Sequence, residues 1–228
     1  MIELELVEKI WSNSKIDPDF RKELKQVCAP AEGEILPGAH TLSALPLVFC
    51  QHFEGNTQSL VPIITAWNIL RLTARLLDDI EDNSPTENDR VSIRLNLSTG
   101  LLFTAFAVLD ELETYGIDTA TAAAISRRFK QACLQTGSGQ HTDLSQAELP
   151  LEKGWEMVEA KSGSALALIC WAGARLGTQE EESLNLAYQF GIQLGILDQI
   201  ADDLKDLWAS ATAETDIKKS PLSSLPII

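Results

Sequence analysis

The sequence predicts an all-α protein, and three observations support this fold class. Apolar residues recur at three- and four-residue spacing along most of the 228-residue chain, as in helices with one buried face. Alternating runs of Val, Ile and Thr, typical of strands, are missing from the sequence. With 45% apolar residues the chain can bury a large core, and its length favours a single domain over residues 1–228.

Breaks in the apolar periodicity divide the chain into about eight predicted helices. They fall at residues 14–19, 29–38, 54–56, 83–88, 116–118, 136–139, 148–150, 177–178 and 209–219. Asp118 is a predicted N-cap, Thr178 and Glu181 have the spacing of a capping box, and Pro85 follows the end of a helix. Residues 207–228 lose periodicity and end on apolar residues, as expected for a chain that is incomplete at its C-terminal end.

Charge and cysteine content narrow the function classes. The net charge of −15, from 18 Lys and Arg against 33 Asp and Glu, argues against nucleic-acid binding. The four scattered cysteines indicate neither a zinc site nor a disulfide framework, so a reducing, cytoplasmic compartment is expected. The N-terminus is acidic, and the apolar stretch around residues 165–174 is too short to span a bilayer. We therefore expect a soluble protein without a membrane span.

Two Asp-rich blocks are the strongest indication of function: DDIED at residues 78–82 and DDLKD at 202–206. In a helix the first and last Asp of each block lie one turn apart, so each block is a carboxylate cluster. Like charges at this spacing destabilise a helix by roughly 0.2–0.5 kcal/mol per pair. A divalent cation removes the repulsion, and Mg²⁺ accepts one or two carboxylates together with water and phosphate. Each block alone also fits a solvated face, but both are embedded in apolar residues and are expected to face an internal cavity.

Four segments, in order along the chain, resemble the motifs of trans-isoprenyl diphosphate synthases, the polyprenyl synthetase family. DDIED at 78–82 is similar to the family's first DDxxD, GQHTDL at 139–144 to GQxxDL, KSGSAL at 161–166 to KTxxL, and LGILDQIADDLKD at 194–206 to FQxxDDxxD. SLP at 224–226 is a weaker match to TLP. The resemblance extends over about residues 66–206.

The resemblance implies an isoprenoid-synthase-type helical bundle around a central apolar cavity. It also implies a Mg²⁺-dependent prenyltransferase, typically with three ions, which ionises an allylic prenyl diphosphate and transfers the prenyl group to an acceptor. Catalytic roles are implied for Asp78, Asp82, Asp202 and Lys161. Metal binding is implied for Asp78, Asp79, Asp82, Asp202, Asp203 and Asp206. Substrate contacts are implied for Gln140, Lys161, Gln199, Thr73, Ala74 and Arg90.

Two further expectations follow from the same resemblance. Thr73 and Ala74 occupy the positions that line the cavity floor in the family, and their small size implies room for a chain of C15 or longer. A homodimer is the family's usual assembly.

The basic residues of the family are the main departure. Its GKRxRP, which grips the diphosphate of isopentenyl diphosphate, falls on residues 38–46, where no Lys or Arg is present. The arginine pair after the first block is not in register, which leaves Arg90 and Arg94 as shifted substitutes. Asp198 replaces the Phe of FQxxDDxxD. The acceptor is therefore isopentenyl diphosphate or another molecule.

Other interpretations stay open. Lys161 also fits a surface lysine, Gln140 and Gln199 fit structural amides, and Arg75 fits either a partner of the acidic block or a diphosphate ligand. A class I terpene cyclase is a second function, although cyclases more often carry an NSE-type second motif. A non-catalytic partner subunit or pseudoenzyme is a third, favoured by the missing basic residues and disfavoured by the two acidic blocks.

Overall fold

The computed structural model is all-α, as predicted, throughout the residues that it describes, which are 2–29, 39–81, 90–145 and 149–212. The first half contains α1 (Leu4–Asn13), α2 (Pro18–Cys28), α4 (Ala39–His52), the 3-10 turn η1 (Thr57–Ser59), α5 (Leu60–Glu81) and α6 (Val91–Leu109). The second half contains the 3-10 turn η2 (Leu112–Tyr115), α7 (Thr119–Ser145), α8 (Leu151–Val158), the π-helical turn η3 (Glu159–Gly163), α9 (Ser164–Arg175) and α10 (Glu181–Thr212).

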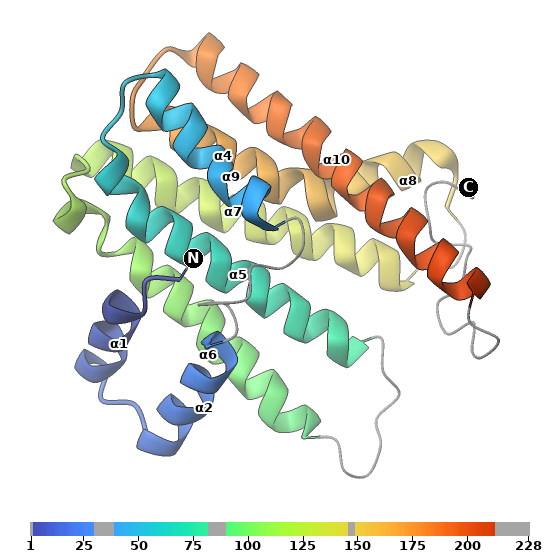
Figure 1. Cartoon of the computed structure of the whole chain (residues 1–228), viewed down its shortest axis with the longest axis horizontal. Helices are drawn as coiled ribbons and strands as arrows, with labels where there is room; N and C mark the ends of the chain where they lie inside the picture. Colours follow the sequence, from blue (N-terminus) through green and yellow to red (C-terminus); the bar gives the residue numbers. More distant parts are fainter. Residues whose placement is uncertain (1, 30–38, 82–89, 146–148, 213–228) are drawn as a thin grey trace.

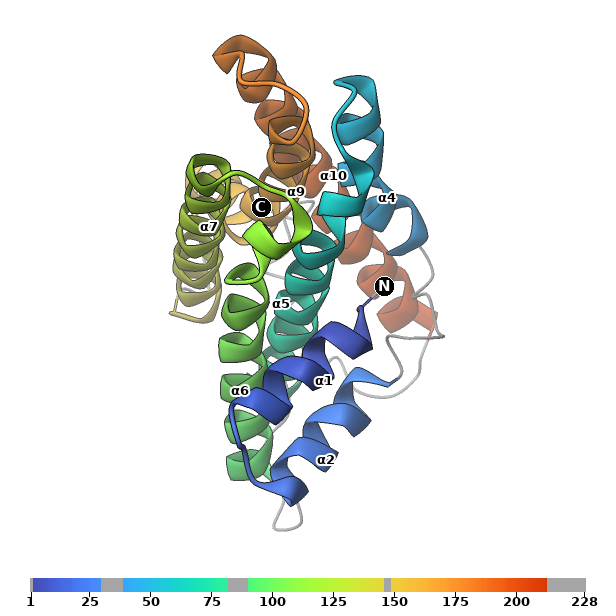
Figure 2. The same ribbon diagram turned by 90° about the vertical axis from the view of Figure 1, so that its left-hand side faces the viewer.

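The helix α9 lies at the centre of the bundle, against α4, α5, α7 and α10 (Figures 1 and 2). Its sequence is apolar on all sides, and every residue from Leu166 to Ala174 is buried, as expected of a helix that is enclosed by others. Burial raises the pKa of the Cys170 thiol to about 12, so this side chain behaves as a small apolar residue. The central position of α9 fixes the spacing of the helices around it.

The short helices α1 and α2 pack on the outer side of α6 (Figure 2). The helix α1 buries Leu6, Val7 and Ile10 against the core. The indole of Trp11 donates a 2.9 Å hydrogen bond to the hydroxyl of Thr104 on α6. This pairing satisfies the one polar group of a buried aromatic side chain.

One predicted helix start is confirmed, whereas another predicted start and one predicted break are wrong. The carboxylate of Asp118 accepts hydrogen bonds from the backbone N–H groups of Ala120 and Thr121, at 3.1 and 3.0 Å. The prediction for Thr178 is wrong, because α10 begins only at Glu181 and the carbonyl of Glu180 accepts its first helical bond; the Thr178 hydroxyl accepts a hydrogen bond from Glu180 N at 3.1 Å, before the helix. The break predicted at residues 136–139 does not occur, because α7 continues to Ser145. The predicted helix end near Pro85 and the SLP segment lie outside the described residues.

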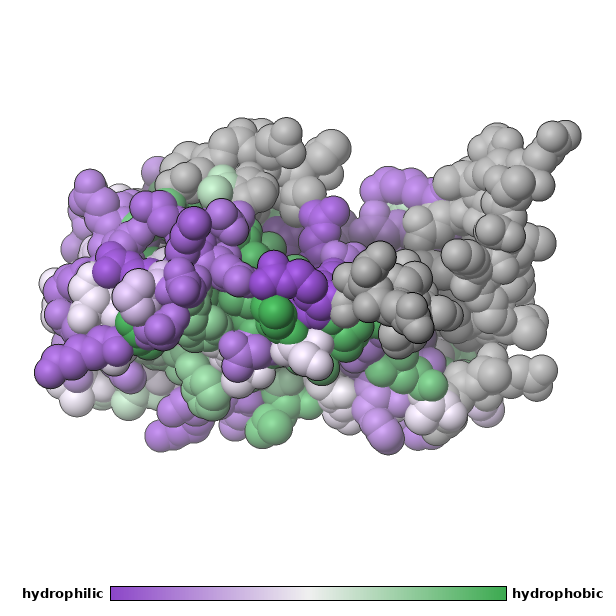
Figure 3. All heavy atoms as spheres, turned by 90° about the horizontal axis from the view of Figure 1, so that it is seen from below, coloured by the Kyte–Doolittle hydropathy of each residue, from purple (hydrophilic) through white to green (hydrophobic). Residues whose placement is uncertain are grey.

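Two helical stretches are long and apolar enough to cross a membrane by length and composition alone, Thr57–Glu81 and Val91–Leu109. Both are longer than the stretch that the sequence singled out. They also supply fully buried core residues, among them Ile63, Ile69 and Leu101, as central helices of an all-α bundle do. Seen from below, the coloured part of the surface is bordered by hydrophilic side chains, and hydrophobic ones gather along its middle (Figure 3).

Candidate active site

The two acidic blocks lie on α5 and α10, each in the C-terminal part of its helix. In the first block Asp78 is half-buried and Asp79 exposed, and in the second Asp202 is exposed and Asp203 half-buried. The other two predicted metal ligands are not described: Asp82 falls in the undescribed segment 82–89, and Asp206 is placed only as part of the backbone of α10. Four of the six carboxylates therefore have described positions.

Electrostatic contacts between α5 and α10 indicate that the faces bearing the blocks are turned toward each other. Burial lowers the pKa of the Arg71 guanidinium, and the carboxylates of Asp198 and Asp202 on α10 act against that shift. Burial, reinforced by Asp202, raises the pKa of Asp198, and Arg71 opposes this rise. Arg71 precedes Asp78 by two helical turns and thus shares its face of α5.

Arg71 is a site residue that sequence reasoning missed. Its guanidinium lies over the ring of Trp67, 4.8 Å from the centroid. Within the described chain it has no ion pair shorter than 4.0 Å. Its spacing from Asp78 on one helix face was the available signal, but no family motif includes this position. The structure therefore adds a cation between α5 and α10.

The two arginines considered as shifted substitutes lie in different places. Arg94 on α6 contacts Asp79 of the first block, with 3.3 Å between guanidinium and carboxylate. Arg90 instead pairs with Glu23 on α2 at 2.9 Å. The structure thus brings Arg94 to the acidic block and directs Arg90 toward α2. Arg94 neutralises part of the repulsion within the block, and the predicted substrate contact of Arg90 remains without a structural observation.

The GQHTDL segment lies near the C-terminal end of α7 and contacts the first acidic block and the KSGSAL segment. The amide of Gln140 donates a 2.7 Å hydrogen bond to the carboxylate of Glu81, in the last described turn of α5. Asp143, one turn later, accepts a 2.6 Å hydrogen bond from the ammonium of Lys161. Both side chains of this ion pair are 22% exposed. Gln140 and Lys161 are therefore held beside the first block and beside α7, respectively.

Lys161 lies in the π-helical turn η3, which interrupts the helix formed by α8 and α9. Such single π turns occur frequently at functional sites. Two glycines allow neighbouring helices to approach this turn closely. A Cβ added at Gly139 of α7 would lie 2.5 Å from the backbone nitrogen of Lys161, and one added at Gly195 of α10 would lie 2.5 Å from the carbonyl oxygen of Ser162. These contacts explain why α7 and α10 have no side chain at these points.

The amide of Gln199 connects η3 with the second block. Its oxygen accepts a 2.6 Å hydrogen bond from the hydroxyl of Ser162, and its nitrogen donates a 2.8 Å bond to Asp203. Because both ends of the amide are used, the Asp203 carboxylate is held in one orientation. In the same block Lys205 pairs with Asp202 at 2.7 Å, on the exposed surface of α10.

The predicted chain-length residues differ in environment. Thr73 is buried, and its hydroxyl donates a 2.9 Å hydrogen bond to the carbonyl of Ile69 one turn earlier. Ala74 is exposed. A larger side chain therefore has room at residue 74 and meets packed atoms at residue 73.

The chemistry of the described carboxylates fits Mg²⁺ bridged by a substrate. Among the described side chains, no three His, Cys, Asp or Glu residues are close enough together to hold a metal ion. Asp78, Asp79, Asp202 and Asp203 offer hard oxygen donors in pairs, and Mg²⁺ is commonly bound by one or two carboxylates with water and phosphate oxygens. These residues would hold the ion together with water or phosphate oxygens.

An all-α bundle with Asp-rich blocks on two facing helices defines a protein of the isoprenoid-synthase type. The chain belongs to the polyprenyl synthetase family, whose sequence pattern it matches over residues 25–225. It is 25% identical over 182 residues to the geranylgeranyl diphosphate synthase of Mycobacterium tuberculosis (strain ATCC 25618 / H37Rv). That alignment covers 75% of this chain and 51% of the relative, so the chain spans about half the relative's length.

Solved structures show the same fold. The polyprenyl synthetase from Streptomyces coelicolor A3(2) aligns with a TM-score of 0.72 at 24% identity, covering 98% of this chain and 70% of that one. A geranyltranstransferase from Methanosarcina mazei aligns with a TM-score of 0.71 at 21% identity, covering 93% and 74%. The predicted fold class and family are thereby confirmed.

Proposed function

We propose that the chain is a Mg²⁺-dependent prenyltransferase that ionises an allylic prenyl diphosphate. The observation that supports this most directly is the electrostatic contact of Arg71 on α5 with Asp198 and Asp202 on α10. It supports a common space between the two block-bearing helices, in which carboxylates from both sides would bind ions on one diphosphate. The family match supports the same reaction class.

Each motif has a distinct part in this reaction. The carboxylates of Asp78, Asp79, Asp202 and Asp203, with Asp82 and Asp206, would hold Mg²⁺, typically three ions in the family, and the bound metal would supply Lewis acidity for the negative charge on a departing diphosphate. Gln199 fixes the orientation of Asp203 through its bond to Ser162. Lys161, a point charge near the same space, exchanges its bond to Asp143 for a diphosphate oxygen when substrate binds.

The substrate follows from the small residues on α5. With Thr73 and Ala74 below the first block, the chain accepts or makes prenyl groups of C15 or longer. The name of the mycobacterial relative, a geranylgeranyl diphosphate synthase, agrees with a long product. The acceptor is isopentenyl diphosphate or, since residues 38–46 lack Lys and Arg, a different molecule. Gln140 and Arg90 complete the proposed substrate contacts.

Product analysis tests the proposal. The purified chain is incubated with Mg²⁺ and C10, C15 or C20 allylic diphosphates, each with and without isopentenyl diphosphate, and the products are identified by mass spectrometry. Prenyl diphosphate products that are longer than the substrate, and that form only when isopentenyl diphosphate is present, support chain elongation. Cyclic hydrocarbons that form from a single substrate support the terpene cyclase alternative. Absence of diphosphate release in every mixture rejects the enzyme and leaves the non-catalytic partner subunit.

We also propose a homodimer in the cytoplasm. Its support is the exposure of large apolar side chains on α6, above all Phe103, which is 66% exposed. A second copy would remove such side chains from water. Sedimentation equilibrium of the wild type and of Phe103→Glu measures this directly, and a monomeric wild type contradicts it.

A further inference from the structure

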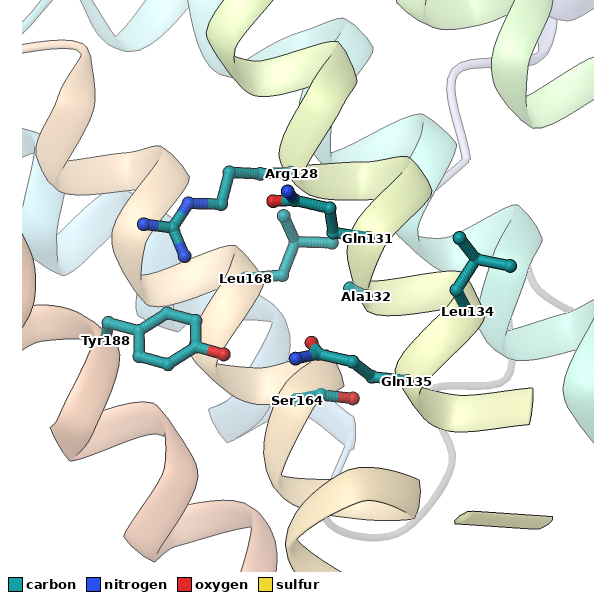
Figure 4. A pocket seen from close by; sticks show the side chains of 8 residues that line it. All are labelled: Arg128, Gln131, Ala132, Leu134, Gln135, Ser164, Leu168 and Tyr188. Carbon is teal, nitrogen blue, oxygen red and sulfur yellow. The ribbon is translucent and has the colours of Figure 1, made fainter. Parts of the chain in front are cut away.

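A pocket outside the proposed active site lies between α7, α9 and α10 (Figure 4). Its volume is about 350 Å³. No described residue of either acidic block lines it. The lining residues are Arg128, Gln131, Ala132, Leu134, Gln135, Ser164, Leu168 and Tyr188.

Arg128 is held by two aromatic rings at the edge of this pocket. Its guanidinium carbon lies 4.9 Å from the ring centroid of Trp171 on α9 and 5.0 Å from that of Tyr188 on α10. Contact with aromatic rings engages the face of the guanidinium and leaves its N–H edge available for oxyanions. No ion pair or hydrogen bond involves the Arg128 side chain within the described residues. Its orientation is therefore fixed while its donors remain unused.

Three further polar groups converge on the same space. Figure 4 shows the phenol of Tyr188 and the amide of Gln135 directed toward each other near Ser164, and the amide of Gln131 closer to Arg128. In the structure as described, none of these three side chains has a hydrogen bond to another protein group. Ser164 differs, because its hydroxyl already bonds to Ala160 O at 2.6 Å and contacts the hydroxyl of Thr136 at 3.1 Å.

The charge of the lining selects an anion. Arg128 is the one charged residue among the lining side chains, and no carboxylate joins it, although the chain carries a net charge of −15. The guanidinium of Arg128, the two amides and the phenol are hydrogen-bond donors, and the oxygens of an oxyanion are acceptors. Leu168 and Ala132 provide an apolar surface next to these donors. The pocket volume is at the lower end of the range of about 300–1,000 Å³ for small-molecule sites.

We propose that this pocket binds a small organic phosphate. The phosphate oxygens bind the N–H edge of Arg128, the amides of Gln131 and Gln135 and the phenol of Tyr188, and the apolar body lies on Leu168 and Ala132. This binding requires no metal ion and none of the acidic blocks, so it is independent of the proposed prenyl transfer.

Calorimetric titration of the full chain with phenyl phosphate, in EDTA, tests the proposal. EDTA removes metal-dependent binding at the acidic blocks. The expected result is saturable 1:1 binding, with weaker binding of inorganic phosphate and none of phenol at the same concentrations. Equal binding of phenol, or no saturation by phenyl phosphate, overturns the proposal.

Charge-matched variants locate the site. Arg128→Met should weaken phenyl phosphate binding by about tenfold or more, the effect expected from losing hydrogen bonds to a charged group. Arg127, the preceding residue of α7, is exposed and does not line the pocket. Arg127→Met removes the same charge and should leave the affinity unchanged. Equal effects of the two substitutions reject the site. If Arg128→Met does not fold, Gln131→Leu replaces it, and undiminished binding by a folded Gln131→Leu rejects the site equally.

Discussion

Lys161 and Asp143 form an ion pair of 2.6 Å between the π-helical turn η3 and α7. The pair connects the KSGSAL and GQHTDL segments. Its two residues are 18 positions apart in the sequence. Because Lys161 already has an anionic partner, the proposed diphosphate substrate would compete with Asp143 for it. The pair thus holds the lysine in place before substrate arrives.

Lys161→Met should lower kcat by about 100-fold, because it removes one preorganised donor to the charge that develops on the leaving group. Asp143→Asn keeps the ammonium and is expected to change KM for the allylic substrate more than kcat. Steady-state kinetics of diphosphate release distinguish the two variants. Wild-type kcat in Lys161→Met would show that the lysine is only a structural partner of Asp143.

Asp202→Ala should abolish turnover without loss of fold. The side chain is exposed, and exposed ion pairs such as that with Lys205 contribute little stability. Its removal also relieves repulsion within the block, so the free energy of unfolding should change by less than about 0.5 kcal/mol. Turnover, a Mg²⁺ titration and urea unfolding are the measurements. Asp110→Ala, at an exposed position that ends α6, is the control and should retain activity.

Gly139→Ala should destabilise the protein by about 1–3 kcal/mol, the typical effect of inserting an atom into a packed contact. The added Cβ would lie 2.5 Å from the backbone nitrogen of Lys161, so it must push η3 away from α7 and should also lower activity. Gly137→Ala in the same helix is the matched control, since a Cβ there meets nothing within 4 Å. It should stabilise α7 by about 0.5–1 kcal/mol. Urea unfolding of both variants gives the comparison.

Asp198 should make stability decrease as pH rises. Burial, with the charge of Asp202, raises its pKa above the usual 3.8, so the folded state binds this proton more tightly than the unfolded state does. The contribution of Asp198 to the free energy of unfolding is fully present below the pKa that it has in the unfolded state. It is lost as pH rises through the pKa that it has in the folded state. Asp198→Asn should therefore have a higher Tm than wild type at neutral pH, and the difference should vanish below about pH 4. Equal Tm values at both pH values would contradict the assignment.

The sequence predicted the helical class, the two acidic blocks and their order with the two motifs between them, because these depend on local periodicity and spacing. It predicted a break at residues 136–139 from two glycines. In the structure Gly139 instead allows η3 to pack closely against α7, and this contact depends on tertiary packing rather than on local sequence. It also offered Arg90 and Arg94 as equivalent substitutes. Their separate partners, Glu23 and Asp79, depend on where α2 and α5 lie relative to α6, which no local pattern specifies.

Ala74→Phe should shorten the prenyl chain that the enzyme accepts or produces. Ala74 is exposed, so a phenyl ring can be added without displacing core atoms. Thr73→Phe is the informative comparison, because Thr73 is buried and bonded to Ile69 O. Overpacking there costs about 1–3 kcal/mol, so that variant should lose stability before it changes the product. Mass spectrometry of products and thermal unfolding of both variants separate the effects. An unchanged chain length in a stable Ala74→Phe would show that residue 74 does not contact the growing chain.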